Sequence, residues 1–199
     1  MRLRNKISLL ILAISFCLST FGFTALGQQV PDVKQRNSRD NSRETARLVK
    51  EIRHELLTLP WYGVFDWLEG TVNPDGSVVL RGWVVRPTTK SDAESRVKDI
   101  EGINNLKSEI QVLPLSPNDD RLRRALYFAL FNDNSPLFRY ALGANPSIHI
   151  IVNNGKATIK GIVGTEADKN IVNVKANGVS GVFEVKNELI IESMQARKE

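Results

Sequence analysis

The residues of this chain that could support metal or acid–base chemistry are few and scattered. The two histidines are His54, between Arg53 and Glu55 in a helical pattern, and His149, between two isoleucines in a strand pattern. We expect His54 on a solvated helix face and His149 pointing away from the buried side of its sheet. Neither histidine has a partner at His-x-x-x-His or Glu-x-x-His spacing, so the sequence predicts no metal site and no cofactor.

Nucleophilic and carboxylate catalysis find equally little to use. The single cysteine, Cys17, lies in an apolar run near the N-terminus. The acidic pairs Asp119-Asp120 and Glu166/Asp168 each fall where a helix should begin, and there the helix dipole favours negative charge. No Gly-x-Ser-x-Gly turn, phosphate loop or Ser/His/Asp set stands out. The sequence therefore predicts no catalytic residue and a binding or structural protein.

The first 27 residues have the layout of a secretory signal. A basic start is followed by an apolar run and by small Ala25 and Gly27 at the cleavage positions. We expect cleavage after Gly27 and export to the periplasm or cell envelope, although the run 7–26 is also long enough for an uncleaved anchor. Cleavage would remove three basic residues and leave a net charge of +2 instead of +5. Export and this small charge argue against nucleic acid as a partner.

One hydrophobic segment with its glycines occurs twice in the chain. "GSVVLRGWVV" begins at Gly76 and "GKATIKGIVG" begins 79 positions later, at Gly155. Glycines that recur at one fixed offset indicate a duplicated structural unit rather than chance alternation of apolar residues. The same offset pairs Gly82 with Gly161, Val84 with Val163, Gly102 with Gly181, Lys107 with Lys186 and Glu109 with Glu188.

Each copy predicts a helix, a hairpin, a second helix and a last strand. The first helix is expected at about 44–57 in one copy, capped by Asn41 or Ser42, and at about 120–131 in the other. Gly82 and Gly161 are expected on the buried strand face, where a missing side chain lets a helix approach. The second helices are expected to bury Ala93, Val97 and Ile100 in one copy and Ala167, Ile171 and Val174 in the other.

The sequence therefore predicts an α+β fold of two tandem α-β-β-α-β units. Each unit would be a three-stranded mixed sheet with two helices on one face. Polar, proline-bearing segments before and between the copies are expected to be a tether and a joint. The expected boundaries are a signal peptide at 1–27, a flexible tether at 28–42, unit one at 43–113, a linker at 114–118, unit two at 119–192 and a polar tail at 193–199.

This pattern resembles the BON (bacterial OsmY and nodulation) domain. The resemblance rests on the strand glycine, on the Gly-hydrophobic turns Gly102-Ile103 and Gly181-Val182, and on Asn187 with Leu189; unit one departs from it with Ser108 in place of asparagine. It covers about 150 of the 199 residues. The resemblance implies an exported, non-enzymatic envelope protein, and such proteins are linked to osmotic or envelope stress and to phospholipid binding.

The opening helix of unit two, "DDRLRRALYFALF", is apolar on more than one side. One face should be buried by the sheet, while aromatic residues and nearby arginines remain outside it. We predict that this second surface binds anionic phospholipid. Alternatively, the aromatic residues pack against unit one. The predicted lipid-binding residues are Arg121, Arg123, Arg124, Tyr127, Phe128 and Phe131.

An aromatic cluster in "LPWYGVFDWLEG" and the following hairpin predicts an interface. Strand alternation places part of it on the sheet face that the helices of unit one do not cover. The expected partner is unit two, and glycan stacking is the weaker alternative because no carboxylate or amide cluster is evident to hold sugar hydroxyls. The predicted interface residues are Trp61, Tyr62, Phe65, Trp67 and Trp83.

Two functions of different class remain open from the sequence. The first is binding of an anionic phospholipid or membrane surface at the cell envelope. The second is a protein–protein scaffold that docks on an envelope protein partner, with lipid affinity incidental; an enzyme ranks third. Lipid binding through arginine should weaken as ionic strength rises, whereas aromatic docking should not.

Overall fold

The computed structural model describes residues 33–143 and 145–192. The predicted signal peptide and polar tail, and the first residues of the predicted tether, lie outside this part of the chain. Unit one consists of α1 (Val33–Leu57), β1 (Trp67–Val72), β2 (Ser77–Val84), α2 (Pro87–Lys98) and β3 (Asn105–Val112).

Unit two repeats this order with one addition, the 3₁₀ helix η1, which the sequence analysis did not anticipate. Its η1 lies between the first helix and the first strand. The elements are α3 (Pro117–Phe131), η1 (Pro136–Tyr140), β4 (Ile148–Asn153), β5 (Lys156–Val163), α4 (Glu166–Asn177) and β6 (Glu184–Ile191).

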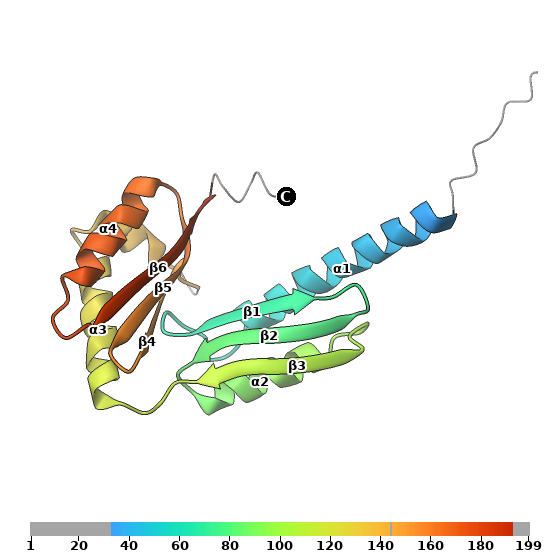
Figure 1. The fold of residues 1–199 in the computed structure, drawn as a ribbon, viewed down its shortest axis with the longest axis horizontal. Coiled ribbons are helices and arrows are strands. Elements are labelled where there is room, and N and C mark those ends of the chain that lie inside the picture. Colours follow the sequence, from blue (N-terminus) through green and yellow to red (C-terminus); the bar gives the residue numbers. More distant parts are fainter. Residues whose placement is uncertain (1–32, 144, 193–199) are drawn as a thin grey trace, which may run out of the picture.

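The two three-stranded sheets have the same mixed topology. Their strand orders are β1-β2-β3 and β4-β5-β6, with an antiparallel first pair and a parallel second pair. The register repeats as well, since Gly82 lies opposite Ile110 and Gly161 lies opposite Leu189. In Figure 1, α1 and α2 lie behind the sheet of unit one, and α3 and α4 cover the sheet of unit two. The α+β class and the mixed three-stranded sheets are confirmed.

Each unit has a hydrophobic core of its own. In unit one, α1 buries Leu48, Ile52 and Leu56 at the predicted four-residue spacing, together with strand residues such as Leu80. In unit two, α3 buries three leucines of the same spacing against the sheet. A four-residue repeat keeps side chains on one helix face, which explains why the sequence located both first helices.

Helix α1 begins earlier than predicted. It starts at Val33 rather than near Glu44, so the prediction of a flexible tether is wrong from residue 33 onward. The segment 33–43 lacks an apolar period, but it holds no proline or glycine that would stop a helix. A helix nucleated on the packed residues can extend through such a segment, because adding a residue to an existing helix costs less free energy than nucleating a new one. Figure 1 shows this part of α1 projecting beyond the sheet.

The buried face predicted for α4 is wrong. The structure buries Val172 and Ala176, while Val174 is 72 % exposed. The buried pair lies 79 positions after Ala93 and Val97, which are fully buried in α2. The repeat offset therefore identifies the correct face, and the prediction failed because it matched apolar residues without keeping that offset.

Gly82 and Gly161 are needed for a reason other than the predicted one. Their φ angles are +136° and +126°, which side chains rarely adopt. A Cβ on Gly161 would lie 2.0 Å from the Ser147 carbonyl oxygen, and a Cβ on Gly82 would lie 1.9 Å from that of Trp67. The glycines thus make room for the backbone of the neighbouring strand, not for a helix.

The joint between the units is shorter than predicted. Pro117 is the first residue of α3, and the Ser116 hydroxyl caps the helix by accepting from the Asp119 amide at 3.2 Å. A second connection is made across the edge of unit two, where the Ile150 amide donates to the Val64 carbonyl at 2.7 Å. The units are therefore joined by a backbone hydrogen bond as well as by the chain.

Candidate functional site

The outer face of α3 displays part of the predicted lipid contact. Arg121, Arg124 and Phe128 are exposed there, at a spacing that keeps them on one side of the helix. Phe128 is 67 % exposed, which is unusual for a large apolar side chain. Arg121 donates to the side chain of Asn118 at 2.9 Å. We call Arg121, Arg124 and Phe128 the α3 stripe.

Arg123 is not part of this surface, which corrects the prediction. Its side chain is 3 % exposed, donates to the Val152 carbonyl at 2.8 Å and forms an ion pair with Asp120. Asp119, also buried, accepts hydrogen bonds at 2.9 Å from the amides of residues 154 and 155. Arg123 and Asp119 therefore fix α3 to the β4–β5 hairpin and are unavailable to a phosphate.

The other two predicted aromatic residues of α3 are withdrawn from the outer face of the helix. Phe131 is buried in the core of unit two, so it too is removed from the lipid contact. Tyr127 is half-buried and packs edge-on against Phe131 at 5.2 Å and Phe65 at 6.3 Å. The alternative in which these rings pack against unit one describes Tyr127, whereas Phe128 stays outside.

The aromatic cluster of unit one encloses His149 of unit two. Tyr62 and Trp67 lie against the imidazole with ring centroids 5.5 and 5.1 Å away. His149 Nδ1 is 3.2 Å from the Gly63 carbonyl oxygen. The histidine points away from the helices of its own unit, as predicted, but unit one covers it and leaves it buried.

Trp61 behaves differently from the rest of the predicted interface. Its side chain is 70 % exposed and its φ is +68°, a strained value for a bulky residue. The Arg86 guanidinium lies 4.8 Å from its ring centroid, a cation–π contact within unit one. Trp61 thus belongs to the free surface and not to the contact between the units.

Lys160 forms an ionic link between the units. Its ammonium group is 3.1 Å from Glu69 of unit one and 2.9 Å from Glu188 of unit two. The same group lies 5.4 Å from the ring centroid of Trp67 and 5.7 Å from that of Trp83. Burial alone would lower the pKa of Lys160, but its hydrogen bonds to Glu188 and Glu69 raise it above the usual range. Lys160 is therefore held charged at the junction.

The surroundings of His149 predict an acid-sensitive junction. Burial lowers the pKa of His149, and its hydrogen bond to Gly63 offsets this only in part. Above the ordinary histidine pKa of about 6.5, His149 is neutral in both the folded and the unfolded chain, and its contribution to stability is fully present. As the pH falls from about 6.5 toward the lowered pKa of the folded protein, the unfolded chain takes up a proton first and this stability is lost. The Asp66 backbone also hydrogen-bonds His149, and Lys160, its neighbour on the adjacent strand, is paired with Glu69. We expect the thermal unfolding temperature to decrease as the pH is lowered below about 6.5.

Melting curves recorded between about pH 5 and pH 8 will check this expectation. His149→Phe should flatten the acid limb, because the titrating group is gone. His54→Gln removes an exposed histidine on α1 and should leave the limb unchanged. An acid limb that survives His149→Phe would assign the effect to another group.

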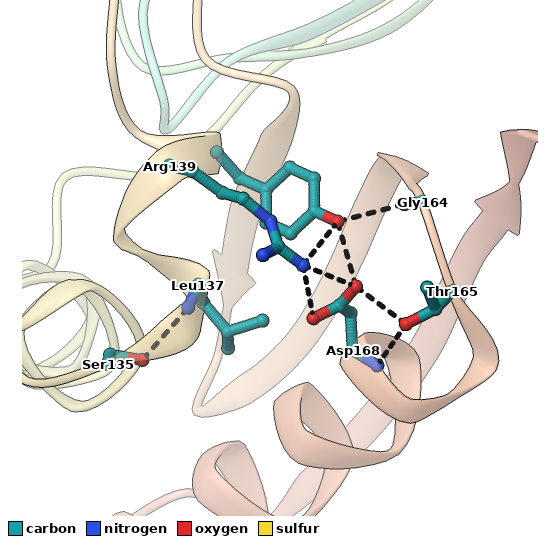
Figure 2. A network of polar contacts seen from close by, with 7 residues as sticks. Ser135, Leu137, Arg139, Gly164, Thr165 and Asp168 are labelled. Atoms are coloured by element: carbon teal, nitrogen blue, oxygen red, sulfur yellow. Dashed lines mark hydrogen bonds and ion pairs between the residues drawn. The ribbon is translucent and has the colours of Figure 1, made fainter.

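A polar network around Asp168 explains the additional helix η1 (Figure 2). The Arg139 guanidinium donates to both carboxylate oxygens at 2.8 and 2.7 Å, and the Tyr140 hydroxyl donates at 2.9 Å. Thr165 donates its hydroxyl at 2.7 Å and caps α4. Burial raises the pKa of Asp168, yet these donors together lower it below the usual range. The network therefore fixes η1 to α4 through the Asp168 carboxylate.

Metal and membrane-spanning features are absent from the described part of the chain. Residues 33–143 and 145–192 contain no group of three or more histidine, cysteine, aspartate or glutamate side chains that could hold a metal ion. Within the same ranges, no helix combines the length and apolar character needed to cross a bilayer.

Comparison with protein families finds one match, to unit two. Residues 118–193 match the family described as "BON domain". Residues 118–193 form a BON domain. The match includes the whole α3 stripe, the Asp168 network and His149, and it lies outside unit one. The BON domain is a non-catalytic family, in keeping with the absence of a catalytic set in the sequence.

Comparison with curated proteins gives no match. Among solved structures, two similar chains are described as CdsD, a structural protein of the type III secretion system of Chlamydia trachomatis, one of them as its C-terminal domain. Both are 13 % identical to this chain; the TM-scores are 0.28 and 0.29, and the matches cover 72 % and 76 % of this chain and 96 % of each of the others.

The sequence analysis missed Lys160 of the BON domain and its partners Glu69 and Glu188. A signal for Lys160 and Glu188 was present, because the 79-residue offset pairs Arg81 with Lys160 and Glu109 with Glu188, whereas Glu69 has no charged counterpart at this offset. In both sheets these positions face each other across the parallel strand pair, on the side away from the helices. Opposite charges at matched positions of a sheet indicate a cross-strand ion pair.

Proposed function

We propose that the chain is an exported, non-enzymatic protein of the cell envelope that binds anionic phospholipid through the BON domain. The observation that carries the proposal is the α3 stripe: two exposed arginines and an exposed phenylalanine on a helix face that no other described element covers. The predicted signal sequence and the phospholipid binding associated with BON domains support it.

The chemistry of the α3 stripe suits the surface of an anionic bilayer. Guanidinium groups donate paired hydrogen bonds to phosphate oxygens, and an aromatic side chain can lie at the boundary between head groups and acyl chains. Each basic residue near an anionic surface contributes about 1 kcal/mol of binding free energy. Arg121 and Arg124 would therefore supply a weak, salt-sensitive attachment that Phe128 reinforces.

Co-sedimentation with vesicles tests the proposal. The chain from Gln28 onward should pellet with anionic vesicles at low salt, less at high salt, and little with zwitterionic vesicles. The double variant Arg121→Glu/Arg124→Glu should weaken binding by roughly thirtyfold or more, because two contributions of about 1 kcal/mol are lost before repulsion is counted.

The matched control is Lys50→Glu/Arg53→Glu on α1. These residues are exposed, have the same three-residue spacing and produce the same change in net charge. This variant should bind anionic vesicles nearly as well as the parent protein. Equal binding by the parent and the α3 variant, with both folded, would refute the α3 stripe as the lipid site.

The alternative function is a protein–protein scaffold, and exposed Trp61 favours it. An exposed tryptophan held by a neighbouring arginine is the kind of residue that anchors protein interfaces. Partner binding through Trp61 should resist high salt and should be lost in Trp61→Asn without any change in vesicle binding.

We further propose that unit one is a second, diverged BON domain, on the basis of its shared topology and strand register.

A further inference from the structure

The uncovered face of the sheet in unit one carries two rows of side chains. The strand register aligns Trp67, Trp83 and Gln111 in one row and Glu69, Arg81 and Glu109 in the next. Side chains of alternate residues share one face of a strand, so both rows point away from α1 and α2. Lys160 of unit two approaches the same face through Glu69 and the two tryptophan rings.

Side chains of these rows line a small pocket of about 200 Å³ that is open to solvent on one side. Its lining includes Glu69, Arg81, Trp83, Glu109, Gln111 and Lys160. Pockets for drug-sized ligands occupy roughly 300–1,000 Å³, so this cavity suits a ligand of about one ring, or one ring of a longer chain.

The charges that line the cavity cancel one another. Arg81 donates to Glu109 at 2.7 Å, and Lys160 lies 3.1 Å from Glu69. A charged ligand would have to break one of these ion pairs, whereas a neutral polar ligand could use the remaining lone pairs and N–H groups. In the described part of the chain, the Trp83 indole N–H and the Gln111 amide have no hydrogen-bond partner. The cavity therefore offers unused donors and acceptors beside a partly exposed aromatic ring.

We propose that this cavity binds a neutral saccharide. One sugar ring would lie against Trp83, because the C–H face of a sugar is apolar and the ring is an apolar platform. Sugar hydroxyls both donate and accept, so they match carboxylates at Glu69 and Glu109 together with the donors of Arg81 and Gln111. The carboxylate and amide cluster that the sequence alone did not reveal is assembled by strand register across β1, β2 and β3.

Unit two shows that this site is specific to unit one. At the 79-residue offset, Ile162 replaces Trp83 and Ile190 replaces Gln111 on the same face of the second sheet. Both isoleucines are apolar and offer no hydrogen bond, while the charged pair is kept as Lys160 and Glu188. The duplicated fold thus tolerates isoleucine at these two positions, and only unit one combines the aromatic ring with the amide.

The isoleucines of unit two supply the variants for a test by isothermal titration calorimetry. The purified protein is titrated with three neutral trisaccharides, cellotriose, maltotriose and N,N′,N″-triacetylchitotriose, and with glucuronic acid as a charged sugar. We expect saturable binding of at least one neutral trisaccharide in the millimolar range or tighter, and weaker binding of glucuronic acid. Trp83→Ile should weaken binding about tenfold or more, the size expected for one lost stacking contact.

Two further variants keep the test decisive. Trp61→Asn removes an exposed tryptophan outside the cavity and should bind as the parent does. Gln111→Ile, at an exposed position, should weaken binding and serves if Trp83→Ile loses its fold by circular dichroism. The proposal is overturned if no neutral trisaccharide gives saturable heat, if glucuronic acid binds more tightly than all three, or if folded Trp83→Ile and Gln111→Ile bind as the parent does. The result is independent of vesicle binding, since neither row includes a residue of α3.

Discussion

Replacing Gly161 with alanine is expected to destabilise the protein by about 3–5 kcal/mol. Two effects add at this position. The φ of +126° is strained for any residue with a Cβ, and that Cβ would lie 2.0 Å from the Ser147 carbonyl oxygen. The oxygen has little freedom to move, because it accepts a hydrogen bond from the Ile162 amide at 2.9 Å. Relief of the clash would therefore separate β4 from β5.

Denaturant unfolding followed by circular dichroism measures this change. Gly143→Ala is the matched control, since Gly143 also has a positive φ, +96°, but a Cβ there would meet nothing within 4 Å. This control should cost only about 1 kcal/mol, the strain of the backbone alone. If both variants lose the same small amount, the clash with Ser147 is not what requires the glycine.

Substitution of two neighbouring arginines by glutamate should distinguish an arginine with a structural role from one on the surface. Arg123→Glu is expected to destabilise the protein by about 3–5 kcal/mol, because it leaves a buried charge without a partner beside Asp119 and Asp120. The lost bonds include the one to the Val152 carbonyl. Arg124→Glu, one residue further along, should change stability by less than about 0.5 kcal/mol, since its side chain is exposed.

Thermal and denaturant unfolding of the two variants give the comparison directly. Arg123→Met is a useful third variant, because it keeps apolar bulk while it removes the charge; its loss should be smaller than that of Arg123→Glu. Equal stability of the Glu variants at positions 123 and 124 would show that Arg123 does not hold α3 to the hairpin.

The sequence predicted the parts of this fold that depend on local periodicity and on the repeat. The apolar spacing of Leu48, Ile52 and Leu56 located α1, and the recurring glycines located both hairpins. The start of α1 could not be predicted in this way, because a polar helix that extends from a packed one has no periodicity of its own.

The candidate sites were harder to predict because they depend on contacts between distant residues. Burial of Arg123 depends on where the β4–β5 hairpin lies over α3, and burial of His149 depends on unit one, 86 residues away along the chain at Gly63. The cavity of unit one depends on the alignment of three strands. Only the α3 stripe depends on the residues of a single helix. Even there, helical periodicity had to show that Arg123 faces the sheet and that Arg124 faces solvent.

The hydrogen bond between Val64 and Ile150 has a consequence for solubility. β4 is one of the two outer strands of its sheet, and such edges pair readily with strands of other molecules. In the intact chain, the loop before β1 occupies part of this edge. At this edge, unit one therefore occupies backbone groups that a strand of another molecule would otherwise pair with.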